Sequence, residues 1–215
     1  MKRLIGLAVI ASLLLAAGCR SAYYSAWEKF GVYKRGLLKK KVVAARDDEK
    51  AASEQFKDAL TRLKELYGFS GGELEKVYNN LQRDYDRSAA RAETVHKRIK
   101  DVETVAEDLF TEWEKEIKEI SSAQLRDSSQ DKLRETRTHY EEMHTALKRA
   151  ERSMEPVLTR FHDQVLYLKH NLNAAAIASL QGETTNIQSE ISKLLVEMNA
   201  AIAQADKFIN VVGTQ

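Results

Sequence analysis

The stretch LEKVYNNLQRDYDRSAARAETVHKRIKDVETVAEDLFTEWEKEIKEI, residues 74–120, decides the fold of this 215-residue chain. Its apolar and small residues recur at steps of three and four, with a mean spacing of about 3.5 residues, which is the repeat of a coiled-coil seam. These positions are Leu74, Val77, Leu81, Tyr85, Ser88, Ala92, Val95, Ile99, Val102, Ala106, Leu109, Trp113, Ile117 and Ile120. The stretch is therefore predicted to be one long helix that packs along a narrow apolar stripe.

Two later segments repeat this spacing, one from Leu133 to Ser179 and one from Ile187 to Ile209. The chain has 1 Pro, 9 Gly and 31% charged residues, a composition typical of long helices. No stretch alternates apolar and polar residues at the spacing of a strand. The sequence thus predicts an all-α protein, an elongated, antiparallel, coiled-coil-like four-helix bundle.

Breaks in the periodicity set the expected helix ends. A glycine cluster at residues 68–72 overlaps a capping-box pattern at Ser70 and Glu73, the periodicity lapses over 121–129, and Gly182 forms a weaker break. The expected helices cover roughly residues 22–67, 73–120, 129–181 and 184–211.

Two features of the third predicted helix leave its course open. Pro156 is expected to bend the helix without ending it, because the periodicity continues on both sides. The alternative to a break at Gly182 is one long helix that runs through it, since Leu180 and Ile187 are seven residues apart and in phase.

The first 18 residues differ in kind from the rest. Lys2 and Arg3 precede an apolar run over residues 4–17, which is too short to span a membrane stably and is typical of a signal peptide. The run ends in LAAGC, which resembles the bacterial lipobox, with Cys19 as the only cysteine. We expect residues 1–18 to be a lipoprotein signal peptide and residues 19–215 to form a bundle domain whose lipid is carried by Cys19.

This interpretation limits the chemistry and the location of the mature chain. A lipid on Cys19 leaves no thiol for a disulfide, a redox motif or a metal. Loss of Lys2 and Arg3 takes the formal charge from +2 to zero, so no basic excess suggests nucleic acid. Arg20, not the aspartate that retains lipoproteins in the inner membrane, follows the cysteine. We therefore expect a membrane anchor in the outer membrane of a cell envelope, facing the periplasm.

Motifs for catalysis or metal binding are sparse. The sequence has no GxSxG, phosphate-binding glycine loop, HExxH or CxxC motif. Glu141 and His144 have the E-x-x-H spacing, but a di-iron bundle needs two such pairs and two further glutamates. We expect no catalytic residue, no metal and no cofactor.

The stretch FHDQVLYLKHNLNAAAIASL, residues 161–180, holds the candidate site residues Lys169, His170 and Asn173. On a continuous helix Lys169 and Asn173 would point into an apolar arc, and His170 would lie at its edge. The carboxylates considered as partners for Lys169 are Asp58, Glu65, Glu73 and Glu190. These residues are interpreted either as buried polar groups that fix the register of the helices or as a ligand-binding site.

Five stretches resemble a known family. They are EKFGVYKR (28–35), LEKVYNNL (74–81), RIKDVETVAEDLFTEWEKEI (98–117), VLYLKHNLNAAAIASL (165–180) and ADKFI (205–209). Together they are similar to bacterial predicted lipoproteins with the domain of unknown function 2959. The resemblance implies a helical, coiled-coil-type envelope lipoprotein and provides neither an established activity nor site residues.

Two functions follow as expectations. The first is a non-enzymatic structural or adaptor role, in which helical surfaces contact an envelope protein partner or a second copy of the chain. The alternative is a periplasmic binding protein that holds a small ligand or a partner peptide between helices near Lys169–Asn173.

Overall fold

A computed structural model describes residues 34–67, 74–171 and 173–213. This part of the chain forms four helices and no strand: α2 (Lys34–Tyr67), α3 (Leu74–Glu119), α4 (Ala123–His170) and α5 (Ala174–Gly213). The prediction of an all-α four-helix bundle is confirmed. None of the described helices is both long enough and apolar enough to cross a membrane.

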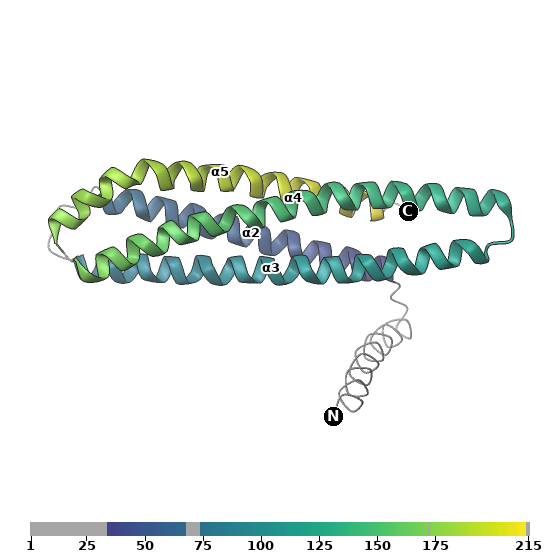
Figure 1. The fold of residues 1–215 in the computed structure, drawn as a ribbon, viewed down its shortest axis with the longest axis horizontal. Coiled ribbons are helices and arrows are strands. Elements are labelled where there is room, and N and C mark those ends of the chain that lie inside the picture. Colours follow the sequence, from purple (N-terminus) through teal and green to yellow (C-terminus); the bar gives the residue numbers. More distant parts are fainter. Residues whose placement is uncertain (1–33, 68–73, 172, 214–215) are drawn as a thin grey trace, which may run out of the picture.

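The helices form an antiparallel rod (Figure 1). α2 packs against α3 and α5, and α4 packs against the same two helices from the other side. The start of α2, the end of α5 and the α3–α4 turn share one end of the rod, here called the proximal end. The α3–α4 turn lies farthest out at that end. The opposite, distal end holds the end of α2, the start of α3 and the reversal from α4 to α5.

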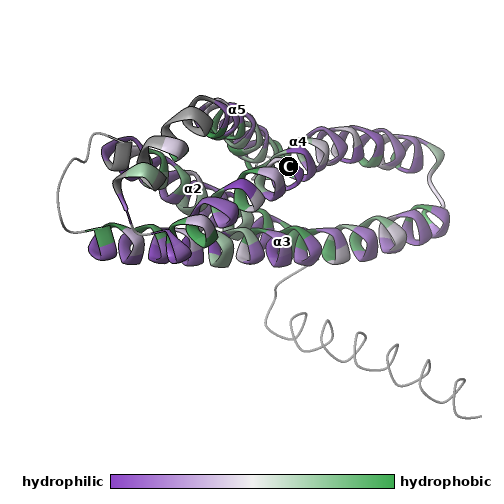
Figure 2. Cartoon of the chain, turned by 60° about the vertical axis from the view of Figure 1, so that its left-hand side comes forward, coloured by the Kyte–Doolittle hydropathy of each residue, from purple (hydrophilic) through white to green (hydrophobic). Residues whose placement is uncertain are grey.

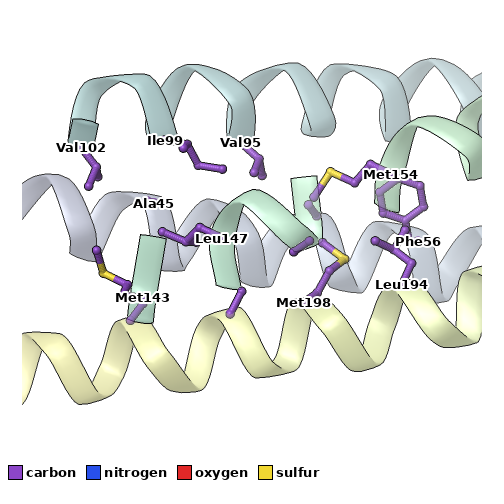
Figure 3. Close-up of a cluster of buried hydrophobic side chains, with 14 of the residues drawn as sticks. Ala45, Phe56, Val95, Ile99, Val102, Met143, Leu147, Met154, Leu194 and Met198 are labelled. Carbon is purple, nitrogen blue, oxygen red and sulfur yellow. The ribbon is translucent and has the colours of Figure 1, made fainter. Parts of the chain in front are cut away.

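The core follows the heptad seams of the helices. In α2 and α5 the most deeply buried positions are separated by alternating steps of four and three residues. They are Leu38, Val42, Ala45, Glu49, Ala52, Phe56, Ala59 and Leu63 in α2, and Ile187, Ile191, Leu194, Met198, Ala201, Ala205, Phe208 and Val212 in α5. Figure 3 shows seam side chains such as Phe56, Ile99, Leu147 and Met198 within one cluster, while Figure 2 shows polar residues on the outer faces. A 3.5-residue repeat keeps such a stripe turned toward its neighbours along the whole rod.

The break between the third and fourth helices was predicted in the wrong place. α4 ends at His170, not at residue 181, and Gly182 lies inside α5, which begins at Ala174 and not at 184. The alternative was one long helix that runs through Gly182. It is correct only in that α5 continues through Gly182, because α4 and α5 are separate helices. One glycine costs a helix only about 1 kcal/mol relative to alanine, which packing readily offsets.

Asparagine ends α4 instead. Asn171 has left the helical region, with φ −134° and ψ 57°, and its Nδ2 donates to the Tyr167 carbonyl at 2.9 Å. Its backbone N–H donates to the Leu168 carbonyl, and the N–H of Asn173 donates to the Asn171 carbonyl at 2.9 Å. A short amide side chain that bonds to a nearby backbone carbonyl competes with the helix in this way.

The other helix ends differ less from the prediction. α3 begins and ends within one residue of its expected limits. α4 begins at Ala123, earlier than the expected residue 129, because Ser122 is its N-cap and the Ser122 Oγ accepts from the Leu125 N–H at 3.4 Å. The helix continues through Pro156, as predicted. The start of the first predicted helix and the Ser70–Glu73 capping box lie outside the described residues.

Candidate functional site

A glutamate in the core is the most unusual feature of the bundle. Glu49 occupies a seam position of α2 and is 0% exposed, and neither of its carboxyl oxygens has a hydrogen-bond partner among the described residues. Burial raises the pKa of Glu49 to about 8, and the negative charge of Glu151 contributes in the same direction. The carboxyl group therefore holds a proton at neutral pH.

The second carboxyl group of this cluster, Glu151 of α4, behaves differently. It contacts His96 Nδ1 of α3 and forms an ion pair with Lys148 Nζ at 2.5 Å. Burial by itself raises the pKa of Glu151, but Lys148 and His96 outweigh it and hold the pKa below its usual value. Two neighbouring carboxyl groups are thus kept in different protonation states, the arrangement that acid–base sites use.

A groove of about 500 Å³ lies between α3 and α4 beside this cluster, and we call it the α3–α4 groove. Its lining residues are Tyr85, Ala89, Ala92, Glu93, His96, Glu151, Met154, Glu155, Leu158, Thr159 and His162. The ring of Tyr85 stacks on that of His162 with centroids 4.9 Å apart. The His96–Glu151 contact lies eleven residues farther along each of the two helices. The groove therefore combines small and apolar residues with carboxylates and aromatic rings.

A second buried carboxylate lies nearer the distal end. Asp84 of α3 is 0% exposed and forms an ion pair with Arg62 of α2. Ser88, one turn later and also buried, donates its hydroxyl to the Asp84 carbonyl at 2.7 Å. This cluster has its own counter-ion, so it forms a structural layer between α2 and α3.

A cavity of about 380 Å³ lies between α4 and α5 near the distal end. Its described lining residues are Arg160, Asp163, Gln164, Tyr167, Ser179, Leu180 and Ile187. Gln164 is buried, and Arg160 Nε binds Glu190 Oε2 at 2.8 Å. This cavity has the mixed lining of a small-molecule site.

The prediction of a buried polar group at the end of α4 is wrong. Lys169, His170 and Asn173 are all exposed, and none of them lines the cavity between α4 and α5. The prediction assumed one helix across this stretch, whereas α4 stops at His170 and the chain reverses. Lys169 and His170 lie in the last turn, where positive charge interacts favourably with the C-terminal end of the helix dipole.

None of the carboxylates expected to pair with Lys169 is shown to do so. Glu190 pairs with Arg160, Asp58 and Glu65 are exposed, and Glu73 lies outside the described residues. Within the described part of the chain, Lys169 forms no ion pair. The three candidate residues thus share a solvent-exposed surface at the distal end.

The other sequence candidates have separate outcomes. Cys19 lies outside the described residues, so its lipidation stays a prediction. His144 Nε2 contacts Glu103 Oε1 of α3 at 2.7 Å, so the E-x-x-H residue pairs with a different glutamate. Over residues 34–67, 74–171 and 173–213, no three His, Cys, Asp or Glu side chains are grouped so that they could hold a metal ion. The expectation of no metal stays a prediction.

Sequence reasoning missed Glu49 and Asp84, although a signal for both was present. Glu49 follows Leu38, Val42 and Ala45 in the alternating four-and-three spacing of the α2 seam, which extending the heptad pattern to the first segment would have shown. In α3 the chosen seam passed through Tyr85, whereas the adjacent Asp84 is the fully buried residue.

Comparison with known proteins gives one match. A family model described as "Protein of unknown function (DUF2959)" matches residues 23–212. No curated protein and no solved structure matches the chain.

Proposed function

Because the chain belongs to the DUF2959 family, whose description names no activity, we propose its function from the geometry of the rod. It is a lipid-anchored protein of the cell envelope with a non-enzymatic structural role, a spacer that presents its distal end to an envelope protein. The anchor is the lipid on Cys19, in the outer membrane and facing the periplasm. The observation that carries this proposal is the placement of the two ends of the rod.

The proximal end is the one nearer to the anchor along the chain. Lys34 Nζ at the start of α2 binds Glu112 Oε1 at 2.7 Å, and the Arg35 guanidinium lies 4.7 Å from the centre of the Trp113 ring. These contacts fix the start of α2 near the end of α3, and Cys19 precedes Lys34 by 15 residues. α3 has 46 residues and is therefore about 70 Å long. If Cys19 anchors the proximal end at the membrane, an upright rod would hold the distal end about that far from the anchored end.

The distal end presents a surface suited to a protein partner. We define the distal surface as Leu166, Tyr167, Lys169, His170 and Asn173, all exposed. Leu166 is 42% and Tyr167 39% exposed, and they are two of the four exposed large apolar side chains in the described part of the chain. Aromatic and apolar side chains flanked by polar ones are typical of the centre of a protein interface.

Site-specific photo-crosslinking in intact cells tests this role. A photoreactive residue at Lys169 or Asn173 is expected to form an adduct with one envelope protein. Leu125 at the α3–α4 turn (63% exposed) and Val196 on the side of α5 (68% exposed) are matched control positions, where that adduct should be absent. Cys19→Ser should abolish both fatty-acid labelling and the distal adducts, because the rod is then no longer held at the membrane.

Three results would contradict the spacer role. Adducts of equal yield at all four positions would mean that no end of the rod is preferred. Adducts that survive in Cys19→Ser would remove the anchor from the mechanism. An adduct at Leu125 alone would place the partner at the proximal end.

The cavity between α4 and α5 favours a second candidate function, the binding of a small ligand near the distal end. Its volume of about 380 Å³ and its mixture of Arg160, Gln164, Leu180 and Ile187 suit a small polar molecule with an apolar part. A compound that co-purifies with the wild-type protein and is lost from Ser179→Leu, which fills the cavity, would favour this function over the spacer.

A further inference from the structure

We propose that the α3–α4 groove is a binding site for a small organic cation, an amine attached to an apolar body. This site is separate from the distal surface and does not depend on the spacer role. Three features of the groove support it: its floor, its charge and its aromatic end.

The floor of the groove accepts an apolar body. Ala89 and Ala92 of α3 face Met154 and Leu158 of α4, and the two alanines leave space that larger seam residues fill elsewhere in the bundle. Ala92 continues the seam of α3, where Val95 and Ile99 occupy the next positions. Covering this floor removes apolar surface from water, which favours binding by about 25 cal/mol per Å².

The charge of the lining selects a cation. Glu93 and Glu155 contribute carboxylates at the rim, and no Lys or Arg is among the described lining residues, whereas the charge of Glu151 is compensated by Lys148 and His96. Glu155 is exposed and forms no ion pair with any described residue. Glu93 has only Lys97 at 3.4 Å, an exposed pair on the helix surface that contributes little. An anion would be repelled here, and a neutral molecule would leave these carboxylates without a new partner.

The aromatic end of the groove adds specificity. At one end the Tyr85 ring, which stacks on His162 and makes a T-shaped contact with Phe161 at 5.9 Å between centroids, provides aromatic surface for an ammonium group. At the other end Glu151, whose side chain is only 14% exposed, is already paired with His96 and with Lys148 Nζ at 2.5 Å, so it contributes no free acceptor for an amine.

Titration of the full-length protein in detergent with three isosteric probes tests the site. Phenethylamine carries the cation, 2-phenylethanol is neutral and phenylacetate is anionic. Ligand-observed NMR should show saturable binding of the amine, with the alcohol at least about tenfold weaker and phenylacetate not bound. In protein-observed spectra of the same titration, the resonances that shift should belong to residues of the groove.

Variants locate the binding. Glu155→Gln removes one rim charge and should weaken amine binding about threefold to tenfold, because an exposed carboxylate contributes modestly. Glu116→Gln removes the same charge from an exposed position of α3 outside the groove and should leave binding unchanged. Ala92→Leu fills the floor and should abolish binding of the amine. Ala89→Leu serves the same purpose if Ala92→Leu does not fold.

The proposal is overturned if the amine does not saturate, or if the alcohol and phenylacetate bind as tightly as the amine. It is equally overturned if binding survives both alanine substitutions. Binding that is lost in Ser179→Leu but kept in Ala92→Leu places the amine in the cavity between α4 and α5 and excludes the groove.

Discussion

Glu49 and Asp84 are two acidic residues at core positions of neighbouring helices, and both are 0% exposed. Asp84 is paired with Arg62 from the adjacent helix. Among the described residues Glu49 has no cation of its own, since Lys148 and His96 are paired with Glu151, and its pKa is raised to about 8. Two residues of the same charge type in similar surroundings are therefore accommodated in different ways.

The comparison shows that a heptad position does not set the charge state of its residue. A buried carboxylate must be paired with a cation or take up a proton, because the uncompensated charge is too costly in the core. Arg62 reaches Asp84 from the surface of α2, where its own side chain is 43% exposed and remains hydrated. The layer around Glu49 includes Glu151, so a proton neutralises Glu49 instead.

Among the substitutions measured at pH 7, removal of the counter-ion should have the largest effect. Arg62→Met is expected to lower the free energy of unfolding by about 3 kcal/mol, the low end for a broken buried pair because Arg62 is itself partly exposed. Urea denaturation at pH 7 measures this change. The double variant Arg62→Met with Asp84→Leu should regain most of the loss, and failure to do so would show that Arg62 acts through packing.

Glu49 should make stability depend on pH. Its pKa is about 8 when folded and close to the ordinary 4.5 when unfolded, so the folded state binds the proton more tightly. The stability that this proton provides is complete below about pH 4.5, falls by about 1.4 kcal/mol per pH unit above it and is lost once the pH exceeds about 8. Urea denaturation from pH 5 to pH 9 measures the slope.

Glu49→Gln should remove this contribution to the slope, because an amide does not titrate. Glu54→Gln changes an exposed glutamate of the same helix and serves as the matched control, in which the slope should persist. An unchanged slope in Glu49→Gln would show that Glu49 is ionised in the folded protein.

Glu151→Gln tests the two causes of the raised Glu49 pKa separately, because it removes the negative charge of Glu151, the smaller cause, and leaves Glu49 buried. The pKa of Glu49 should fall but stay above its ordinary value, since burial is the larger cause. Stability at pH 7 should fall by about 1 kcal/mol, because His96 and Lys148 lose their partner. NMR titration of the glutamate carboxyl carbons measures the pKa. A return of the Glu49 pKa to 4.5 would reverse the order of the two causes.

The polar residues at the end of α4 should show the smallest effect. The double substitution Lys169→Met with Asn173→Leu is expected to change Tm by less than about 2 °C, because both side chains are exposed. Thermal unfolding followed by circular dichroism measures this change. A larger change, or mixed oligomers, would restore the interpretation of these residues as a register-setting group.

The helices and most of the seams of α3, α4 and α5 were predictable from residue spacing alone, because a 3.5-residue repeat of apolar residues has few other stable solutions. The predicted seams missed Asp84 in α3, and in α5 they passed through Ile202 and Ile209, whereas Ala201 and Phe208 are the buried residues. The limits of α3 followed from the same pattern to within one residue. The end of α4 did not, because Gly182 and Asn171 both weaken a helix and their intrinsic preferences differ by too little to decide between them.

The all-α class, the long antiparallel helices and the sparse set of catalytic motifs followed from the sequence, since these depend on composition and on local periodicity. Which polar residues are buried depended on the packing of the helices, because burial is set by what the neighbouring helices place opposite each position. This packing moved Lys169, His170 and Asn173 to the surface and placed Glu49 in the core. It also brought Glu151 of α4 close enough to Glu49 of α2 to affect its pKa, although the two residues lie far apart in the sequence.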